Sequence, residues 1–307
     1  MSRTRRWPVG LVLVLLVLLG AEVVAFVTVC RFFVQSPHGQ QLDTVSLTGN
    51  RIGQDRIEGF VVAVLDTISV LSVILATAAV GFIALIRRRI VVAVAAILLI
   101  AGANATTEIL KRVIHRPRFG VDLPRAGLGN SLPSGHTTIA ASVAVALVLV
   151  LPVALRGIGA LVGAFGAAVV GVGTLSAGWH RPSDAVAALL VVGAWASAAG
   201  LFIVMAQRHH GGVEYGPVNW RALLTLVAAG LVLLVGAGIA LVLTNQVRTT
   251  PPEALGRARL FVAYAGGAMG IAGTVGLVQA SVLATAHRVV PRAVAPAPKN
   301  EDATVEG

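Results

Sequence analysis

Residues 90–118 read IVVAVAAILLIAGANATTEILKRVIHRPR, and this stretch decides the fold class. Over residues 90–110 the only charged side chain is Glu108. A helix of about 20 mostly apolar residues is long enough to cross the hydrocarbon of a bilayer. The stretch therefore predicts a membrane-spanning helix that ends in a basic cluster, Lys111 to Arg118, and Glu108 and Lys111 have the spacing of a helix-face ion pair.

The composition of the whole chain extends this conclusion. Of its 307 residues 56% are hydrophobic and 12% charged, with a mean hydropathy of +0.87. Soluble domains average about 45–50% apolar and about 25% charged residues, so a soluble fold and a disordered chain are both excluded. The single cysteine, Cys30, excludes an internal disulfide and a cysteine-built metal site. The net charge of +11 is assigned to arginines at the ends of spans, and no nucleic-acid partner is expected.

Apolar stretches of similar length recur along the chain and predict an all-α, polytopic membrane helical bundle. The first stretch follows Arg3, Arg5 and Arg6, but no small-x-small site follows it closely, so we expect a retained span rather than a cleaved signal peptide. The fourth and fifth stretches are separated only by Arg156 and Gly157, which predicts a tight hairpin there. The expected spans are residues 9–30, 59–86, 90–110, 137–155, 158–176, 184–206, 222–244 and 260–285.

The arginines predict the orientation. Positive residues concentrate in cytoplasmic loops, and the strongest signals are the basic N-terminus and the run Arg87-Arg88-Arg89. We therefore expect a protein of the plasma membrane with both termini in the cytoplasm. The cluster at 111–118 is then expected on the outer face.

Two further polar clusters fall at the same face on this topology. Leu132-Pro133-Ser134-Gly135-His136 opens the fourth span, and Trp179-His180-Arg181-Pro182-Ser183-Asp184 joins the fifth to the sixth. Each cluster alone has a structural explanation: a headgroup-binding helix end, a helix cap, or a local hydrogen bond. Their combination on one face favours a functional site, because polar residues kept at span ends are functional candidates.

The clusters have the chemistry of a phosphoryl-transfer site. Lys111 and Arg118 supply fixed cations for phosphate oxygens. Ser134 and Gly135 place a hydroxyl and backbone amides at the positive end of a helix dipole.

The same clusters hold candidates for acid and nucleophilic catalysis. His136 and His180 supply an acid and a nucleophile, and Asp184 is spaced to hold His180 in one tautomer.

These residues resemble the signature of the type 2 phosphatidic acid phosphatase superfamily. The family pattern is Lys-x6-Arg-Pro, then Pro-Ser-Gly-His, then Ser-Arg-x5-His-x3-Asp. Lys111 and Arg118 fit the first block except that Phe119 replaces its proline, residues 133–136 fit the second in full, and His180 and Asp184 fit the end of the third. The resemblance covers roughly residues 90–206.

The resemblance implies a role for each residue. His180 would take the phosphoryl group as phosphohistidine, Asp184 would orient it, and His136 would protonate the leaving oxygen. The phosphate oxygens would be held by Lys111, Arg118, Ser134 and the Gly135 amide. No metal or other cofactor is implied. The substrate would be a lipid phosphate or pyrophosphate taken from the bilayer, with polyprenyl pyrophosphate favoured and phosphatidic acid or phosphatidylglycerol phosphate open.

The chain departs from the family where the third block begins, because Gly173 and Thr174 replace Ser-Arg. Thr174 supplies at most a neutral hydrogen bond to phosphate, and Arg181, Arg116 or Arg112 could supply the missing guanidinium. The alternatives to a hydrolase are a non-catalytic protein that binds lipid phosphate and a phosphotransferase that passes the phosphoryl group to a hydroxyl.

The expected organisation has four parts. An N-terminal span and outer loop occupy 1–58, and a phosphatase-type membrane core occupies 59–206; with the first span, this core makes six helices. A two-span extension follows at 207–286, and a disordered cytoplasmic tail at 287–307.

Overall fold

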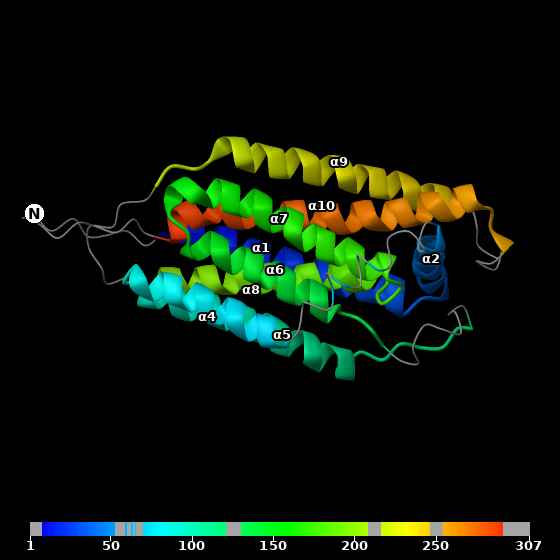
Figure 1. Ribbon diagram of the computed structural model, residues 1–307, viewed down its shortest axis with the longest axis horizontal. Helices are drawn as coiled ribbons and strands as arrows, with labels where there is room; N and C mark the ends of the chain where they lie inside the picture. Colours follow the sequence, from blue (N-terminus) through cyan, green and yellow to red (C-terminus); the bar gives the residue numbers. More distant parts are fainter. Residues whose placement is uncertain are drawn as a thin grey trace, which may run out of the picture.

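The computed structural model is an elongated bundle of helices, most of which run roughly along its length (Figure 1). It describes residues 8–52, 59, 63, 65, 70–120, 130–207, 216–245 and 254–290. The basic N-terminus with Arg3, Arg5 and Arg6 lies outside the described residues, as does most of the predicted tail.

Every predicted span corresponds to a helix in the described part of the chain. These helices are α1 (Val9–Val29, continued by a π-helix at Cys30–Val34), α4 (Val70–Ile86), α5 (Ile90–Val113), α6 (Gly135–Val150), α7 (Val153–Ser176), α8 (Pro182–Ala206), α9 (Trp220–Asn245) and α10 (Arg257–Val289). Among the described residues six helices are long and apolar enough to cross a membrane, and α4 and α6 contribute shorter apolar helices. The protein is therefore a multi-pass membrane protein with an all-α fold.

Two predicted boundaries were wrong. The hairpin between the fourth and fifth spans lies at Leu151 and Pro152, because Pro152 interrupts the helical hydrogen bonds and begins α7. Arg156 is a buried residue of α7: its Nε donates to the Leu151 carbonyl (3.1 Å) and its Nη1 to the Ala286 carbonyl (3.2 Å). The predicted tail also begins too early, because α10 continues to Val289.

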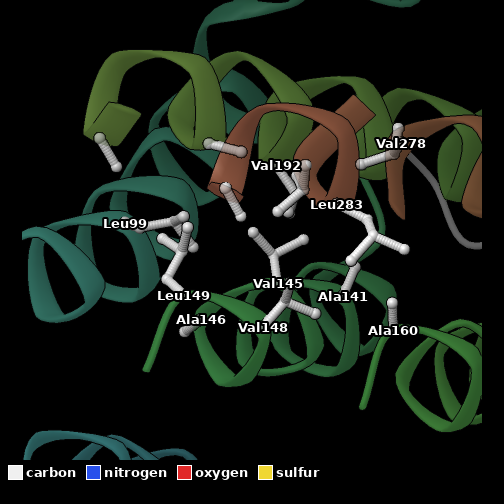
Figure 2. Packing of buried hydrophobic residues seen from close by; sticks show 14 of the residues in the cluster. Leu99, Ala141, Val145, Ala146, Val148, Leu149, Ala160, Val192, Val278 and Leu283 are labelled. Atoms are coloured by element: carbon white, nitrogen blue, oxygen red, sulfur yellow. The ribbon is translucent and has the colours of Figure 1, made fainter. Parts of the chain in front are cut away.

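The core is organised around the short helix α6. Val145, Val148 and Leu149 of α6 are almost fully buried, and Figure 2 shows them among Leu99 of α5 and Val192 of α8. Leu283 of α10 reaches the same cluster, so the last helix of the chain helps to fix the position of α6.

Helices α9 and α10 pack closely against each other and against the preceding bundle. A Cβ at Gly276 would come within 3.1 Å of the Gly230 Cα, so the absence of side chains at these two positions lets the backbones approach. Helix α10 also contacts α7 and α8. Helix α10 is thus packed onto α6, α7 and α8, the helices beside the second and third polar clusters.

The predicted outer loop contains a helix of its own, α2 (Pro37–Thr48), followed by a short 3-10 turn at Gly49–Arg51. Ser36 begins α2 by accepting a hydrogen bond from the Gly39 amide (3.0 Å), and Pro37 occupies its first position. Helix α2 lies at the end of the bundle where α5 ends (Figure 1). Gln40 fixes it there, because its Nε2 donates to the Pro117 carbonyl (2.9 Å).

Candidate active site

The second cluster forms the N-terminus of α6. Ser134 is fully buried and its Oγ accepts hydrogen bonds from the Thr137 amide (3.4 Å) and the Thr137 hydroxyl (3.0 Å). Ser134 is therefore the N-cap of α6. The first turn of the helix directs its backbone amides, beginning at Gly135, toward the end of the bundle, where an anion is favoured.

The first cluster places a lysine at that helix start. The Lys111 Nζ lies 3.1 Å from the point that a Gly135 Cβ would occupy, so a side chain at position 135 would move the lysine away by a few tenths of an ångström. Lys111 also forms the predicted ion pair with Glu108 (2.6 Å). About a quarter of the Lys111 side chain is exposed (27%), so a ligand can reach it. A cation and a helix dipole thus act on the same small region.

The third cluster forms the turn between α7 and α8. The Thr174 carbonyl accepts hydrogen bonds from the amides of Trp179 (3.0 Å) and His180 (3.2 Å). Gly178 has φ +73°, a left-handed conformation that suits glycine. Asp184 then closes the start of α8, because its Oδ2 accepts from the Arg181 amide (3.0 Å). Local hydrogen bonds therefore fix the backbone of the turn that carries the His180 side chain.

Asp184 joins the second and third clusters. Its fully buried Oδ2 accepts a hydrogen bond from the Ser131 hydroxyl (2.6 Å), and its backbone carbonyl accepts from the Ser134 amide (2.9 Å). The same Oδ2 lies 3.4 Å from the His180 Nδ1, a long hydrogen bond of the kind that often shortens when a substrate binds. With Nδ1 directed at Asp184, the Nε2 of His180 points away from it.

The two histidines lie close together. The ring centroids of His136 and His180 are 6.5 Å apart, and His136 is 5.3 Å from the Trp179 ring. His136 belongs to α6 and His180 to the turn before α8. The structure thus brings together two imidazoles and a buried carboxylate from different elements. Lys111 lies beside Gly135, at the same end of α6 as His136.

A comparison with known families agrees with this arrangement. The PAP2 superfamily matches residues 90–210, which comprise α5 to α8 and all three clusters. Over this segment the chain is similar to the PAP2 superfamily. No curated protein and no solved structure matches it. This similarity indicates a phosphatase-type activity on phosphate esters.

Arg118 and Thr174, two of the predicted phosphate-binding residues, differ sharply in exposure. Arg118 is exposed, in the extended segment after α5. Thr174 has no exposed surface, and its hydroxyl donates to the Gly171 carbonyl (2.8 Å). The expected hydrogen bond from Thr174 to phosphate is therefore not available in this conformation, and Thr174 contributes its carbonyl to the His180 turn.

The three arginines considered as replacements occupy different surroundings. Arg112 is exposed on the last turn of α5. Arg116 and Arg181 are only 7% and 4% exposed, and the Arg181 Nη1 donates to the Ser131 hydroxyl (3.3 Å). Arg181 is thus a buried cation of the third cluster, and Arg116 is a buried cation of the segment that follows α5.

Two residues at the site were missed by sequence reasoning. Ser131 directly precedes the second block and binds Asp184. Asp43 lies on α2, and its Oδ2 accepts a hydrogen bond from the Ser183 hydroxyl (2.5 Å). Burial raises the pKa of Asp43 to about 7; the nearby Asp184 also raises it, while the Ser183 hydrogen bond and the Arg181 and Arg116 charges lower it. Asp43 is the only acid between residues 35 and 52, which was the one available signal.

Proposed function

We propose that this protein is a lipid phosphatase that hydrolyses a phosphomonoester or pyrophosphate of a membrane lipid through a phosphohistidine on His180. The observation that carries the proposal is the contact of His180 with the buried carboxylate of Asp184, beside His136 on a neighbouring helix. A protein that only binds phosphate has little need of a histidine oriented in this way.

In the first step His180 is the nucleophile. Asp184 accepts a hydrogen bond from the Nδ1–H group of His180, so the proton stays on Nδ1 and the lone pair of Nε2 is free to attack phosphorus. A bond forms between Nε2 and phosphorus while the bond from phosphorus to the leaving oxygen breaks. His136 gives its proton to that oxygen, which departs as the lipid alcohol or lipid monophosphate.

In the second step water completes hydrolysis. His136, now neutral, takes a proton from the water as the water oxygen bonds to phosphorus. The bond from phosphorus to Nε2 breaks, and inorganic phosphate leaves with both histidines restored to their starting states. No residue changes its net protonation over the cycle.

Phosphate charge is balanced by fixed cations. Lys111 and the Gly135 amide act at the start of α6, where the helix dipole adds to their effect. Arg118 approaches from its exposed segment when substrate binds. Arg116 or Arg181 supplies the guanidinium that position 174 lacks, while Ser134 supports the site as the cap of α6.

The location of the site favours a lipid substrate at the outer face. The candidate residues lie at the C-terminal end of α5, whereas Arg87 and Arg89 precede its N-terminal end. A helix from Ile90 to Val113 is about 36 Å long, enough to separate the two groups by a bilayer. With these arginines in the cytoplasm, the site faces outward, where a polyprenyl pyrophosphate would reach it laterally within the membrane.

The test is release of phosphate by the full-length, detergent-purified protein with chelator present. The substrates are polyprenyl pyrophosphate, phosphatidic acid and phosphatidylglycerol phosphate. We expect turnover of at least one, abolished in His180→Ala and reduced at least about 100-fold in His136→Ala. His115→Ala is the matched control, because His115 is an exposed histidine at the same end of the bundle. Acid-labile, base-stable radiolabel on wild type from a labelled substrate would identify the phosphohistidine.

The arginines are tested in the same assay. Arg116→Ala and Arg181→Ala are each compared with Arg112→Ala. We expect the buried arginine that binds phosphate to lose about 100- to 1,000-fold in rate when replaced, the loss typical of one transition-state donor. Full activity in both variants would contradict the replacement of the missing arginine.

A second candidate function rests on the buried hydroxyl of Thr174. A site without the third-block arginine could bind a lipid phosphate and release it unchanged. Wild type that binds all three lipids but releases no phosphate, with the same affinity in His180→Ala, would favour this binding protein over the hydrolase. Transfer of the label to an added alcohol in place of water would identify a phosphotransferase.

A further inference from the structure

Helix α2 connects two of the three clusters from outside the PAP2 segment. Asp43 is 2% exposed; its Oδ1 accepts from the Ser183 amide (3.2 Å) and its Oδ2 from the Ser183 hydroxyl (2.5 Å). Gln40 lies three residues earlier, on the same face of the helix. It is also buried, and its Nε2 donates to the Pro117 carbonyl (2.9 Å). One turn of α2 therefore makes hydrogen bonds both to the segment after Lys111 and to the first turn of α8.

We propose that Asp43 is a positioning residue for His180, acting through Ser183, and that α2 holds the first and third clusters in register. The proposal rests on the phosphatase function argued above. Ser183 is adjacent to Asp184, so a hydrogen bond to both its amide and its hydroxyl fixes the turn from which Asp184 reaches His180.

The charged side chains around Asp43 also connect α2 with the first and third clusters. Asp43 lies among the electrostatic neighbours Arg116, Arg181 and Asp184, which come from the segment after α5 and from the start of α8. All four side chains are at most 7% exposed. The two arginines favour the ionised form of Asp43 and the nearby Asp184 disfavours it, so its hydrogen bonds to Ser183 fix its position whichever form is present. Asp43 is the member of this group that α2 contributes.

The surroundings of Asp43 leave Ser183 as its main polar partner. On its other side the Asp43–Ser183 pair borders a cavity of about 200 Å³ between α2, α8, α9 and α10. The cavity wall is mainly apolar, with residues such as Leu42, Leu234 and Ala263. A carboxyl at this position therefore gains little from any contact except those with α8 and the arginines.

The test compares kcat, KM and melting temperature in full-length variants. Asp43→Ala removes both hydrogen bonds to Ser183. Asp43→Asn preserves them, because its oxygen accepts from the Ser183 amide and its amide group donates to the Ser183 hydroxyl. We expect about a 100-fold loss of kcat in Asp43→Ala with KM within about threefold, as for a small misplacement of a reacting group. Asp43→Asn should remain within about threefold of wild type.

A matched control separates positioning from general stability. Thr44→Val changes the next residue of α2, which is also buried and whose hydroxyl has no hydrogen-bond partner among the described residues. If Asp43→Ala keeps wild-type kcat, or loses no more than Thr44→Val at an equal change in melting temperature, the proposal is overturned. Where Asp43→Ala does not fold, Ser183→Ala gives the answer: a fall of at least fivefold in kcat supports the proposal, and a smaller one overturns it.

A measurement independent of activity separates this inference from the proposed function. Amide hydrogen exchange is followed by mass spectrometry in wild type, Asp43→Ala and Thr44→Val. We expect residues 176–184 to exchange at least tenfold faster in Asp43→Ala alone, and unchanged exchange would overturn the proposal. A wild type without turnover would refute the phosphatase, while exchange would still decide the role of Asp43.

Discussion

Gly135→Ala offers a sharp test of the anion site, because it separates catalysis from folding. Gly135 does not adopt a positive φ, so alanine is allowed by the backbone. The new Cβ would lie 3.1 Å from the Lys111 Nζ and 3.8 Å from the Glu108 Oε1. The end of a lysine side chain can move by the few tenths of an ångström that this contact requires. Alanine also favours helix by up to about 1 kcal/mol over glycine, so the melting temperature should stay the same or rise.

Gly135→Ala should instead lower the catalytic efficiency. A methyl group at this point blocks phosphate from the Gly135 amide and moves Lys111 away. A hydrogen bond to a charged group contributes about 1.5–3 kcal/mol. At about 1.4 kcal/mol per factor of ten, this predicts a loss of about 10- to 150-fold in kcat/KM for phosphate release.

Gly166→Ala is the matched control. It changes a helical glycine of α7 whose Cβ would meet nothing within 4 Å. The reasoning would be refuted by a Gly135→Ala variant with wild-type kcat/KM, or by one that loses activity only in proportion to a lowered melting temperature.

The remaining predictions concern single side chains. Asp184→Asn should lower kcat by about 10³- to 10⁴-fold in the phosphate-release assay, because the amide favours the wrong tautomer of His180; a loss below tenfold would contradict its orienting role. Thr174→Val should keep kcat/KM within about threefold, because its hydroxyl is bonded to the Gly171 carbonyl and not to substrate; a 100-fold loss would restore Thr174 as a phosphate ligand. The raised pKa of Asp43 means that the folded protein binds a proton on this carboxyl more tightly than the unfolded chain does. The resulting stabilisation is complete below about pH 3.8 and is lost as the pH rises through about 7. The melting temperature of wild type minus that of Asp43→Asn should therefore decrease from pH 5 to pH 8, and an increase would contradict the raised pKa of Asp43. Arg156→Met should lower stability by about 1–3 kcal/mol per lost carbonyl partner while kcat stays unchanged, because Arg156 lies at the opposite end of α7 from the His180 turn.

The spans could be predicted because each depends on a local property. A run of about 20 apolar residues is a sufficient signal for a helix in a bilayer, and all eight runs correspond to helices in the described part of the chain. The hairpin at Leu151 and Pro152 was misplaced because hydropathy treated Arg156 as a loop residue. A buried arginine that binds two helix-end carbonyls has the same sequence signature as an exposed one.

Much of the candidate site could be predicted for the same reason. The spacing of His180 and Asp184 is one helical turn, so their contact is local, and the Glu108–Lys111 pair is local too. Asp43 and Ser183 are 140 positions apart, and no short-range pattern connects them. Their contact depends on how α2 packs against α8, which only the three-dimensional structure provides.

The departure at Thr174 has a physical explanation in the same packing. Position 174 is fully buried in α7, so an arginine there would need a buried anion or a bound phosphate to balance its charge. In this chain two acidic side chains, Asp43 and Asp184, already lie close to two buried arginines, Arg116 and Arg181, and the formal charges of the group cancel only when Asp43 is ionised, at a pH above its pKa of about 7. A third buried arginine would leave an excess of positive charge whenever substrate is absent. Thr174 avoids that excess and still supplies the carbonyl that holds His180, so the charge needed for phosphate is expected from arginines that α2 helps to hold.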